Sequence, residues 1–221
     1  KLQRTNQPFV LVDRSPLGIN ADIVESNHEQ GAYLATEHLL AQGHSKILIL
    51  VPLPIILPVQ LRIRGYERAL IKAGLEPQPD WNIGVDPKLS VIGAQENRRW
   101  YGGYRTILPV LKQSTPPLAV FALDNTTGWG VYQACQELGL RIPEDISVIC
   151  FDDSDVALGM APPMTTVAQQ TDEIGRVAIE LLERRFRRSD DIKRKHLQTF
   201  TRVVVDVKLI ERQSVARLVD G

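Results

Sequence analysis

The feature that most constrains the fold is a regular alternation of short apolar strands with amphipathic helices. The stretches Leu118 to Leu123 and Ile146 to Phe151 are both apolar enough to form buried strands. Between them, apolar residues recur at helical spacing up to the helix stop Gly139; they are Val131, Ala134, Cys135 and Leu138. A strand, a crossover helix and a second strand make a βαβ unit, so the sequence predicts an α/β fold with parallel sheets.

The same alternation runs along most of the chain. We expect further strands at 9–12, 23–25, 47–51 and 83–85, and a final strand pair within 199–209. Helices are expected between the cap Asn27 and the stop Gly43, and over 64–73, 104–111 and 171–186.

Composition narrows the classes of function. The chain has 26 Lys and Arg against 26 Asp and Glu, so it carries no broad basic field with which to bind nucleic acid by itself. The segment 184–196 is basic, which indicates either an anion contact or a solvated helix end. No apolar run reaches the roughly 20 residues of a membrane span. The two cysteines, Cys135 and Cys150, have no metal-ligand spacing, so we expect no metal. The sequence has no GxGxxG motif and no P-loop, and we expect no cofactor.

Polar residues follow three of the predicted strands. Asp13 follows the first strand, Asp124 and Asn125 follow the strand that ends at Leu123, and Asp152 follows the strand that ends at Phe151. Ligands of open parallel sheets bind at the carboxyl ends of strands, and carboxylate and amide groups suit a polyol or sugar. The alternative is structural, since Asp and Asn are also common turn and helix-cap residues.

Other residues allow two interpretations each. Arg62 could offer a guanidinium fork to a ligand or form a surface salt bridge. Trp100 and Tyr101 could stack on a sugar or cover the edge of the core. The pair Asp152 and Asp153 could do acid–base work, but no nucleophile or base motif accompanies it, so no catalytic residue is predicted.

Several motifs in the expected order resemble the effector-binding region of the LacI/GalR family of bacterial transcriptional regulators. They span nearly the whole chain: 8–14, 38–44, 62–66, 139–149, 151–153, 162–167 and 209–214. The resemblance implies a type I periplasmic-binding-protein-like fold with two Rossmann-like parallel-sheet subdomains.

The resemblance also implies a division of the chain. Residues 1–26 and 166–188 would belong to an amino-terminal subdomain, residues 27–163 and 199–216 to a carboxy-terminal subdomain, and residues 217–221 to a tail. The family's helix-turn-helix, hinge helix and first strands have no counterpart in these residues. The amino-terminal subdomain is therefore expected to be incomplete in this chain.

Residue by residue, the resemblance carries specific roles. Arg62 and Asp152 match positions at which such regulators hold their effector, while Asp124-Asn125 reverses the family's usual Asn-Asp. Trp129 and Met160 match positions of the family's dimer interface, which implies a homodimer. Two departures are the apolar loop 54–58 before Arg62 and Cys150 in place of a usual Gly, so a standard sugar pocket is not implied.

Together these points predict the effector-binding and dimerisation part of a cytoplasmic transcriptional regulator. Its effector would be a sugar or related polar metabolite, bound between the subdomains, and it would contact operator DNA only through the absent amino-terminal domain. Two alternatives stay open: a periplasmic sugar-binding protein of a transport system, and an α/β enzyme that uses Asp152 or Asp153 on a sugar.

Overall fold

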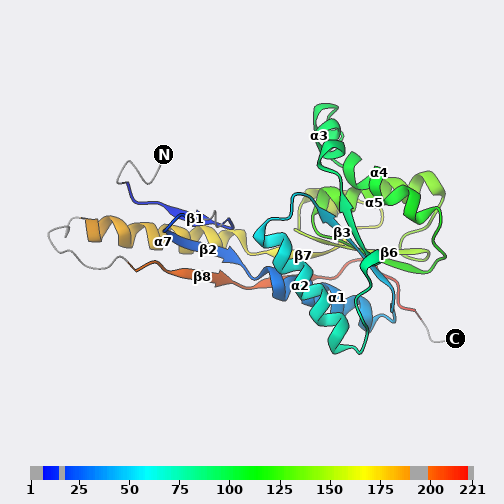
Figure 1. The fold of residues 1–221 in the computed structure, drawn as a ribbon, viewed down its shortest axis with the longest axis horizontal. Helices are drawn as coiled ribbons and strands as arrows, with labels where there is room; N and C mark the ends of the chain where they lie inside the picture. The colour runs from blue at the N-terminus through cyan, green and yellow to red at the C-terminus, as the bar shows by residue number, and fades with distance from the viewer. Residues whose placement is uncertain (1–6, 15–17, 190–198, 219–221) are drawn as a thin grey trace. The chain divides into compact units, whose positions relative to one another are not determined.

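The computed structural model describes residues 7–14, 18–189 and 199–218, in two compact units (Figure 1). The first unit comprises Lys1–Asn27 and Gln169–Val207, and the second comprises His28–Ala168 and Lys208–Gly221. Much of the basic segment 184–196 and the end of the expected tail lie outside the described residues.

The second unit is built on a six-stranded sheet with the order β4-β3-β5-β6-β7-β9. The pairs β3–β4, β3–β5, β5–β6 and β6–β7 are parallel, which confirms the predicted α/β fold with a parallel sheet. The strands are β3 (Ile47–Pro52), β4 (Asn82–Val85), β5 (Leu118–Ala122), β6 (Ile146–Phe151), β7 (Thr165–Gln169) and β9 (Val207–Ile210).

Helices cover both faces of this sheet, with α1 and α2 on one face and α4 and α5 on the other (Figure 1). Their bounds are α1 (His28–Ala41), α2 (Leu57–Lys72), α3 (Pro87–Gln95), α4 (Tyr101–Leu111), α5 (Asn125–Leu138) and α6 (Asp155–Gly159), with a 3₁₀ turn at Pro79–Trp81. Several of these differ from expectation: α2 begins seven residues earlier and α4 three residues earlier, and α3, α6 and the 3₁₀ turn were not predicted.

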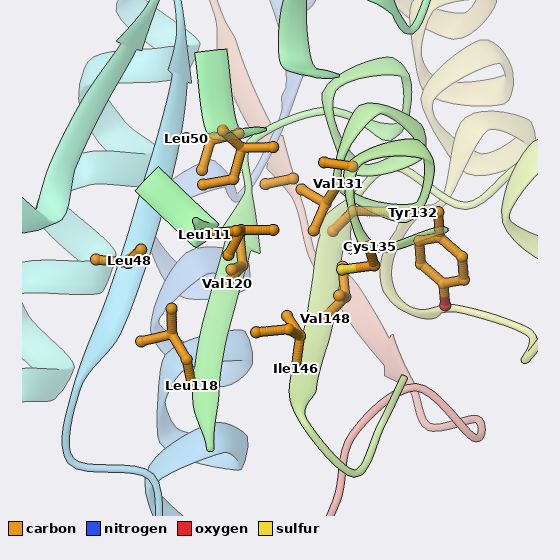
Figure 2. Close-up of a cluster of buried hydrophobic side chains, with 14 of the residues drawn as sticks. Leu48, Leu50, Leu111, Leu118, Val120, Val131, Tyr132, Cys135, Ile146 and Val148 are labelled. Atoms are coloured by element: carbon orange, nitrogen blue, oxygen red, sulfur yellow. The ribbon is translucent and has the colours of Figure 1, made fainter. Parts of the chain in front are cut away.

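One core of the second unit lies between the sheet and the helices α4 and α5. Alternate residues of three strands point to this side, where they contact apolar residues of both helices (Figure 2). The cluster includes Leu48, Leu50, Val120, Ile146 and Val148 from the strands and Leu111, Val131 and Cys135 from the helices. Each fully buried aliphatic side chain contributes about 1.5–3 kcal/mol relative to exposure, so this cluster fixes the sheet that carries the candidate site.

Local signals explain where several of these elements begin and end. Gly139 ends α5 with φ of 67°, a left-handed conformation that glycine adopts without strain, as predicted. Asp86 caps α3 by accepting a hydrogen bond from the Lys88 backbone N–H, and Pro87 opens the helix.

In its described residues, the first unit contains a three-stranded parallel sheet and one helix. The strand order is β1-β2-β8, formed by β1 (Val10–Val12), β2 (Asp22–Ser26) and β8 (Arg202–Val205), and α7 (Thr171–Ser189) contacts it. The small core consists of Val24, Ile174, Leu181 and Val205.

This sheet corrects two expectations from the sequence. The segment 199–209 is not a strand pair, because β8 pairs with β2 while β9 joins the six-stranded sheet. The boundaries therefore differ from the expected ones: residues 199–207 fall in the first unit, and residues 166–168, in β7, fall in the second. One stretch of chain thus serves two sheets, with only Asp206 between β8 and β9.

Within the described ranges, no helix combines the length and the apolar character needed to cross a membrane.

Candidate functional site

A buried arginine forms the centre of the candidate site in the second unit. Arg62, on α2, is only 6% exposed, and its Nε donates to His28 Nδ1 at 3.3 Å. Its Nη1 donates to the Leu123 carbonyl oxygen, and its Cζ lies 3.6 Å from the centroid of the Phe151 ring. Its Nη2 lies 3.7 Å from Asp152 Oδ1. The guanidinium therefore lies across the carboxyl ends of β5 and β6, the edge at which open parallel sheets bind ligands.

Small residues let the surrounding elements come close enough to build this arrangement. A Cβ on Gly65, three residues after Arg62, would lie 2.0 Å from the Glu29 carbonyl oxygen, so only glycine allows this approach of α2 to α1. A Cβ on Gly31 would lie 2.7 Å from the Phe151 ring. Because these two positions are glycines, α1 packs closely against both α2 and the end of β6. This close packing places His28 within hydrogen-bond distance of Arg62.

Asp152 supplies the carboxylate of the site. It directly follows β6, has φ of 77°, and its backbone N–H donates to the Val167 carbonyl oxygen at 2.9 Å. Its side chain is 31% exposed, whereas that of Arg62 is 7% exposed. The pair thus presents a partly accessible acceptor beside a buried, fixed cation, which is a suitable arrangement for a hydroxylated ligand.

The neighbouring predicted residues make structural contacts. Asp124 caps α5: it accepts hydrogen bonds from the Thr127 backbone N–H and the Thr126 hydroxyl, both at 2.7 Å. Asn125 donates from Nδ2 to Ser154 Oγ at 2.7 Å. The helix-cap alternative considered from the sequence is therefore realised at Asp124.

Asp153 does not share the surroundings of Asp152. Its two carboxylate oxygens accept from the Arg212 guanidinium at 2.8 and 3.0 Å, and the Thr166 hydroxyl donates to it at 2.9 Å. The Arg212 hydrogen bonds lower the pKa of Asp153 despite partial burial. Arg212 also donates to the Met164 carbonyl oxygen, so Arg212 ties the segment after β9 both to Asp153 and to the start of β7.

Asp13 belongs to the first unit. It follows β1 with φ of 54°, and its backbone N–H donates to the Val24 carbonyl oxygen at 2.8 Å. Its Oδ1 accepts a hydrogen bond from the Ser26 backbone N–H at 3.1 Å. The carboxylate therefore lies at the carboxyl ends of β1 and β2, the edge that was expected for it.

Trp129 lies in a half-buried aromatic cluster on α4 and α5. Its ring centroid is 6.4 Å from that of Trp100, which in turn lies 5.4 Å from Tyr104 and 6.3 Å from Tyr101. Trp100 and Tyr101 thus contact other aromatic rings at the edge of the core. Met160, at the end of α6, also packs against the core of this unit.

Within the described ranges, the cysteines and the metal-binding residue types form neither a thiolate nor a metal site. Cys135 and Cys150 are buried free cysteines; burial raises the pKa of Cys135 to about 12 and also raises the pKa of Cys150, so both are protonated thiols. Among the residues that the structure describes, no group of three or more His, Cys, Asp or Glu side chains could hold a metal ion.

One residue of the arrangement was not found from the sequence. His28 had no motif around it, and its contact with Arg62 depends on how closely α1 and α2 approach. The only sequence signal was Gly65, which stands one helical turn after Arg62.

Comparison with known proteins gives consistent relatives. The periplasmic binding protein-like domain family matches residues 36–215. The ribose operon repressor of Haemophilus influenzae is 32% identical over 211 residues, which are 96% of this chain and 58% of that protein. The HTH-type transcriptional repressor PurR of the same species is 33% identical over 208 residues, 94% of this chain and 57% of that protein. The chain thus spans somewhat more than half the length of these relatives.

Solved structures agree. A LacI family transcriptional regulator from Enterococcus faecium with bound ribose has a TM-score of 0.79 and 29% identity, covering 98% of this chain and 73% of that one. A complex of the transcriptional regulator CelR with cellobiose has a TM-score of 0.77 and 28% identity, covering 94% and 58%. The fold and these matches agree with one another. The chain belongs to the family of periplasmic binding protein-like domains, in the form carried by LacI-family transcriptional regulators.

Proposed function

We propose that this chain is the effector-binding domain of a LacI-type transcriptional regulator that senses a sugar-like small molecule. The observation that carries the proposal is the pair formed by buried Arg62 and partly exposed Asp152 at the carboxyl edge of the six-stranded sheet. Two similar regulators have been solved with ribose and with cellobiose, which supports a sugar as the effector class.

The chemistry of the pair fits a hydroxylated ligand. The Asp152 carboxylate accepts hydrogen bonds from ligand hydroxyls, and the Arg62 guanidinium donates to ligand oxygens. Asp13, Asp124 and Asn125 supply further acceptors and donors at strand ends, and we include them in the proposed ligand-binding set. In this proposal binding shifts a conformational equilibrium of the domain, which the DNA-binding segment reads.

We further propose that the chain acts as a homodimer through the face that carries Trp129 and Met160. The aromatic cluster around Trp129 supports this assignment, since Trp, Tyr and Met are enriched at protein interfaces. Sedimentation should therefore detect a dimer that Trp129→Glu converts to a monomer of unchanged circular dichroism. A monomeric wild-type chain would contradict the dimer.

The remaining parts of the proposal concern the whole regulator. Operator DNA is contacted through a helix-turn-helix outside these 221 residues, in the cytoplasm, and the first and second units are the amino-terminal and carboxy-terminal subdomains. In this proposal the chain binds its sugar without converting it, which is supported by Asp153, the second carboxylate considered for catalysis, whose two oxygens both accept hydrogen bonds from Arg212.

Calorimetric titration of the full chain with D-ribose and cellobiose tests the sensor. We expect one site per chain, with affinity at least tenfold weaker in Asp152→Asn. Asp80→Asn is the matched control, because exposed Asp80 precedes β4 at the amino-terminal edge of the sheet, and its affinity should equal that of wild type. Absence of binding across a panel of pentoses, hexoses and disaccharides would refute the sugar class, and a chemically altered sugar after incubation would indicate an enzyme.

A further inference from the structure

The guanidinium of Arg62 is fixed on three sides. Its Nε donates to His28 Nδ1 at 3.3 Å, and its Nη1 donates to the Leu123 carbonyl oxygen. Its face stacks on Phe151, with Cζ 3.6 Å from the ring centroid. Two in-plane hydrogen bonds and one stacked ring define both the position and the plane of the group, so Nη2 is directed to Asp152.

The direction of the bond between Arg62 and His28 follows from the chemistry of the two groups. A guanidinium has N–H donors and no acceptor, so the His28 Nδ1 must accept with its lone pair. That requires a neutral imidazole with its proton on Nε2. A protonated ring would instead turn an N–H toward the guanidinium and place two cations side by side.

The surroundings of His28 confine its ring. It is 1% exposed as the first residue of α1, and its ring centroid lies 5.6 Å from that of Phe151 at an interplanar angle of 39°. The same phenylalanine therefore contacts both the histidine and the arginine. The three side chains form one packed unit drawn from α1, α2 and the end of β6.

We propose that His28 is the positioning residue for effector binding: its neutral ring accepts the Arg62 Nε–H and thereby holds the guanidinium beside Asp152. This inference rests on the proposed role of Arg62 as an effector ligand. Without His28, the guanidinium keeps its bond to Leu123 but can turn about it, and Nη2 no longer has a fixed direction.

The first test needs no ligand. In ¹⁵N NMR of the full chain at neutral pH, His28 should have an unprotonated Nδ1 and a protonated Nε2, and the Arg62 Nε–H should exchange slowly with water. His28→Leu should abolish that slow exchange, whereas His28→Asn, whose side-chain oxygen replaces the acceptor, should retain it. His38→Leu, on the same helix with its ring 3.8 Å from Glu211, is the matched control and should change nothing at Arg62. A protonated Nδ1, or unchanged Arg62 exchange in His28→Leu, would overturn the proposal.

The second test measures how the loss of His28 changes sugar affinity. A hydrogen bond to a charged group corresponds to roughly a tenfold change in binding, so D-ribose affinity should fall about tenfold in His28→Leu and stay within about threefold of wild type in His28→Asn. Equal losses in both variants would make His28 merely structural and overturn the positioning role. If wild type binds no sugar, the proposed effector class fails while the NMR result still decides the contact between His28 and Arg62.

Discussion

Replacing Gly65 by alanine should both destabilise the second unit and disturb the candidate site. The added Cβ would lie 2.0 Å from the Glu29 carbonyl oxygen, 2.9 Å from the Tyr33 backbone nitrogen and 3.0 Å from the Ala32 Cβ. Ordinary contacts begin at 3.4 Å, so α1 and α2 must separate. Backbone atoms cannot rotate away as a side chain can, and the separation would also pull Arg62 from His28.

The expected magnitude follows from two opposing effects. Overpacking of a well-packed interior costs about 1–3 kcal/mol, and a rigid backbone contact places this case at the upper end. Exchanging glycine for alanine inside a helix returns about 1 kcal/mol, so we expect a net loss of about 2 kcal/mol. Sugar affinity should fall in parallel.

The matched control is Gly175→Ala in α7, where an added Cβ meets nothing within 4 Å. This variant should gain about 0.5–1 kcal/mol through helix propensity alone. Chemical denaturation of both variants, followed by circular dichroism, measures the two changes. Gly65→Ala as stable as wild type would refute the close helix approach on which the site depends.

Three further predictions concern other contacts. Burial lowers the pKa of His44, whose Nε2 lies 3.2 Å from the Ala216 carbonyl oxygen. Its stabilising contribution is thus present above the unfolded pKa of about 6.5 and is lost as pH falls through the folded pKa. His44→Gln should therefore weaken the pH dependence of the denaturation midpoint between pH 7 and 5. Ser214→Ala should lower the free energy of unfolding by about 1–3 kcal/mol in denaturant titration, because the buried Ser214 Oγ donates to the Val148 carbonyl oxygen and accepts from the Thr165 backbone N–H. A loss no larger than that of Ser114→Ala, whose hydroxyl makes one hydrogen bond to the Val110 carbonyl oxygen, would contradict this. Asp152→Asn should weaken sugar binding at least tenfold in calorimetry while Asp80→Asn does not.

Much of the second unit could be predicted because its local signals agree with its tertiary structure. The strand 146–151 was predicted with its observed bounds, and Gly139 ends α5 as expected. Helix α3 was missed although Asp86 and Pro87 are cap and first-turn residues, because its apolar face is short. The division of 199–209 between two sheets could not be predicted, since strand propensity does not specify the partner strand.

The sequence predicted the two charged residues of the candidate site but not the contacts that hold Arg62 in place. Arg62 and Asp152 were both expected, and they lie together. The surface salt bridge considered for Arg62 does not describe it, because the residue is buried and bound to His28, Leu123 and Phe151. Those contacts come from three separate elements, and their distances depend on how closely helices and strands pack.

The most direct test of the regulator proposal measures operator binding by the natural gene product that contains this chain, with and without its sugar. Allosteric coupling energies of about 1–3 kcal/mol correspond to a change of roughly 5- to 150-fold in DNA affinity. We predict a change in this range for the wild type. In Asp152→Asn, the sugar concentration needed to produce that change should be at least tenfold higher. Sugar binding that leaves DNA affinity unchanged, or a gene product that binds no DNA, would contradict the account.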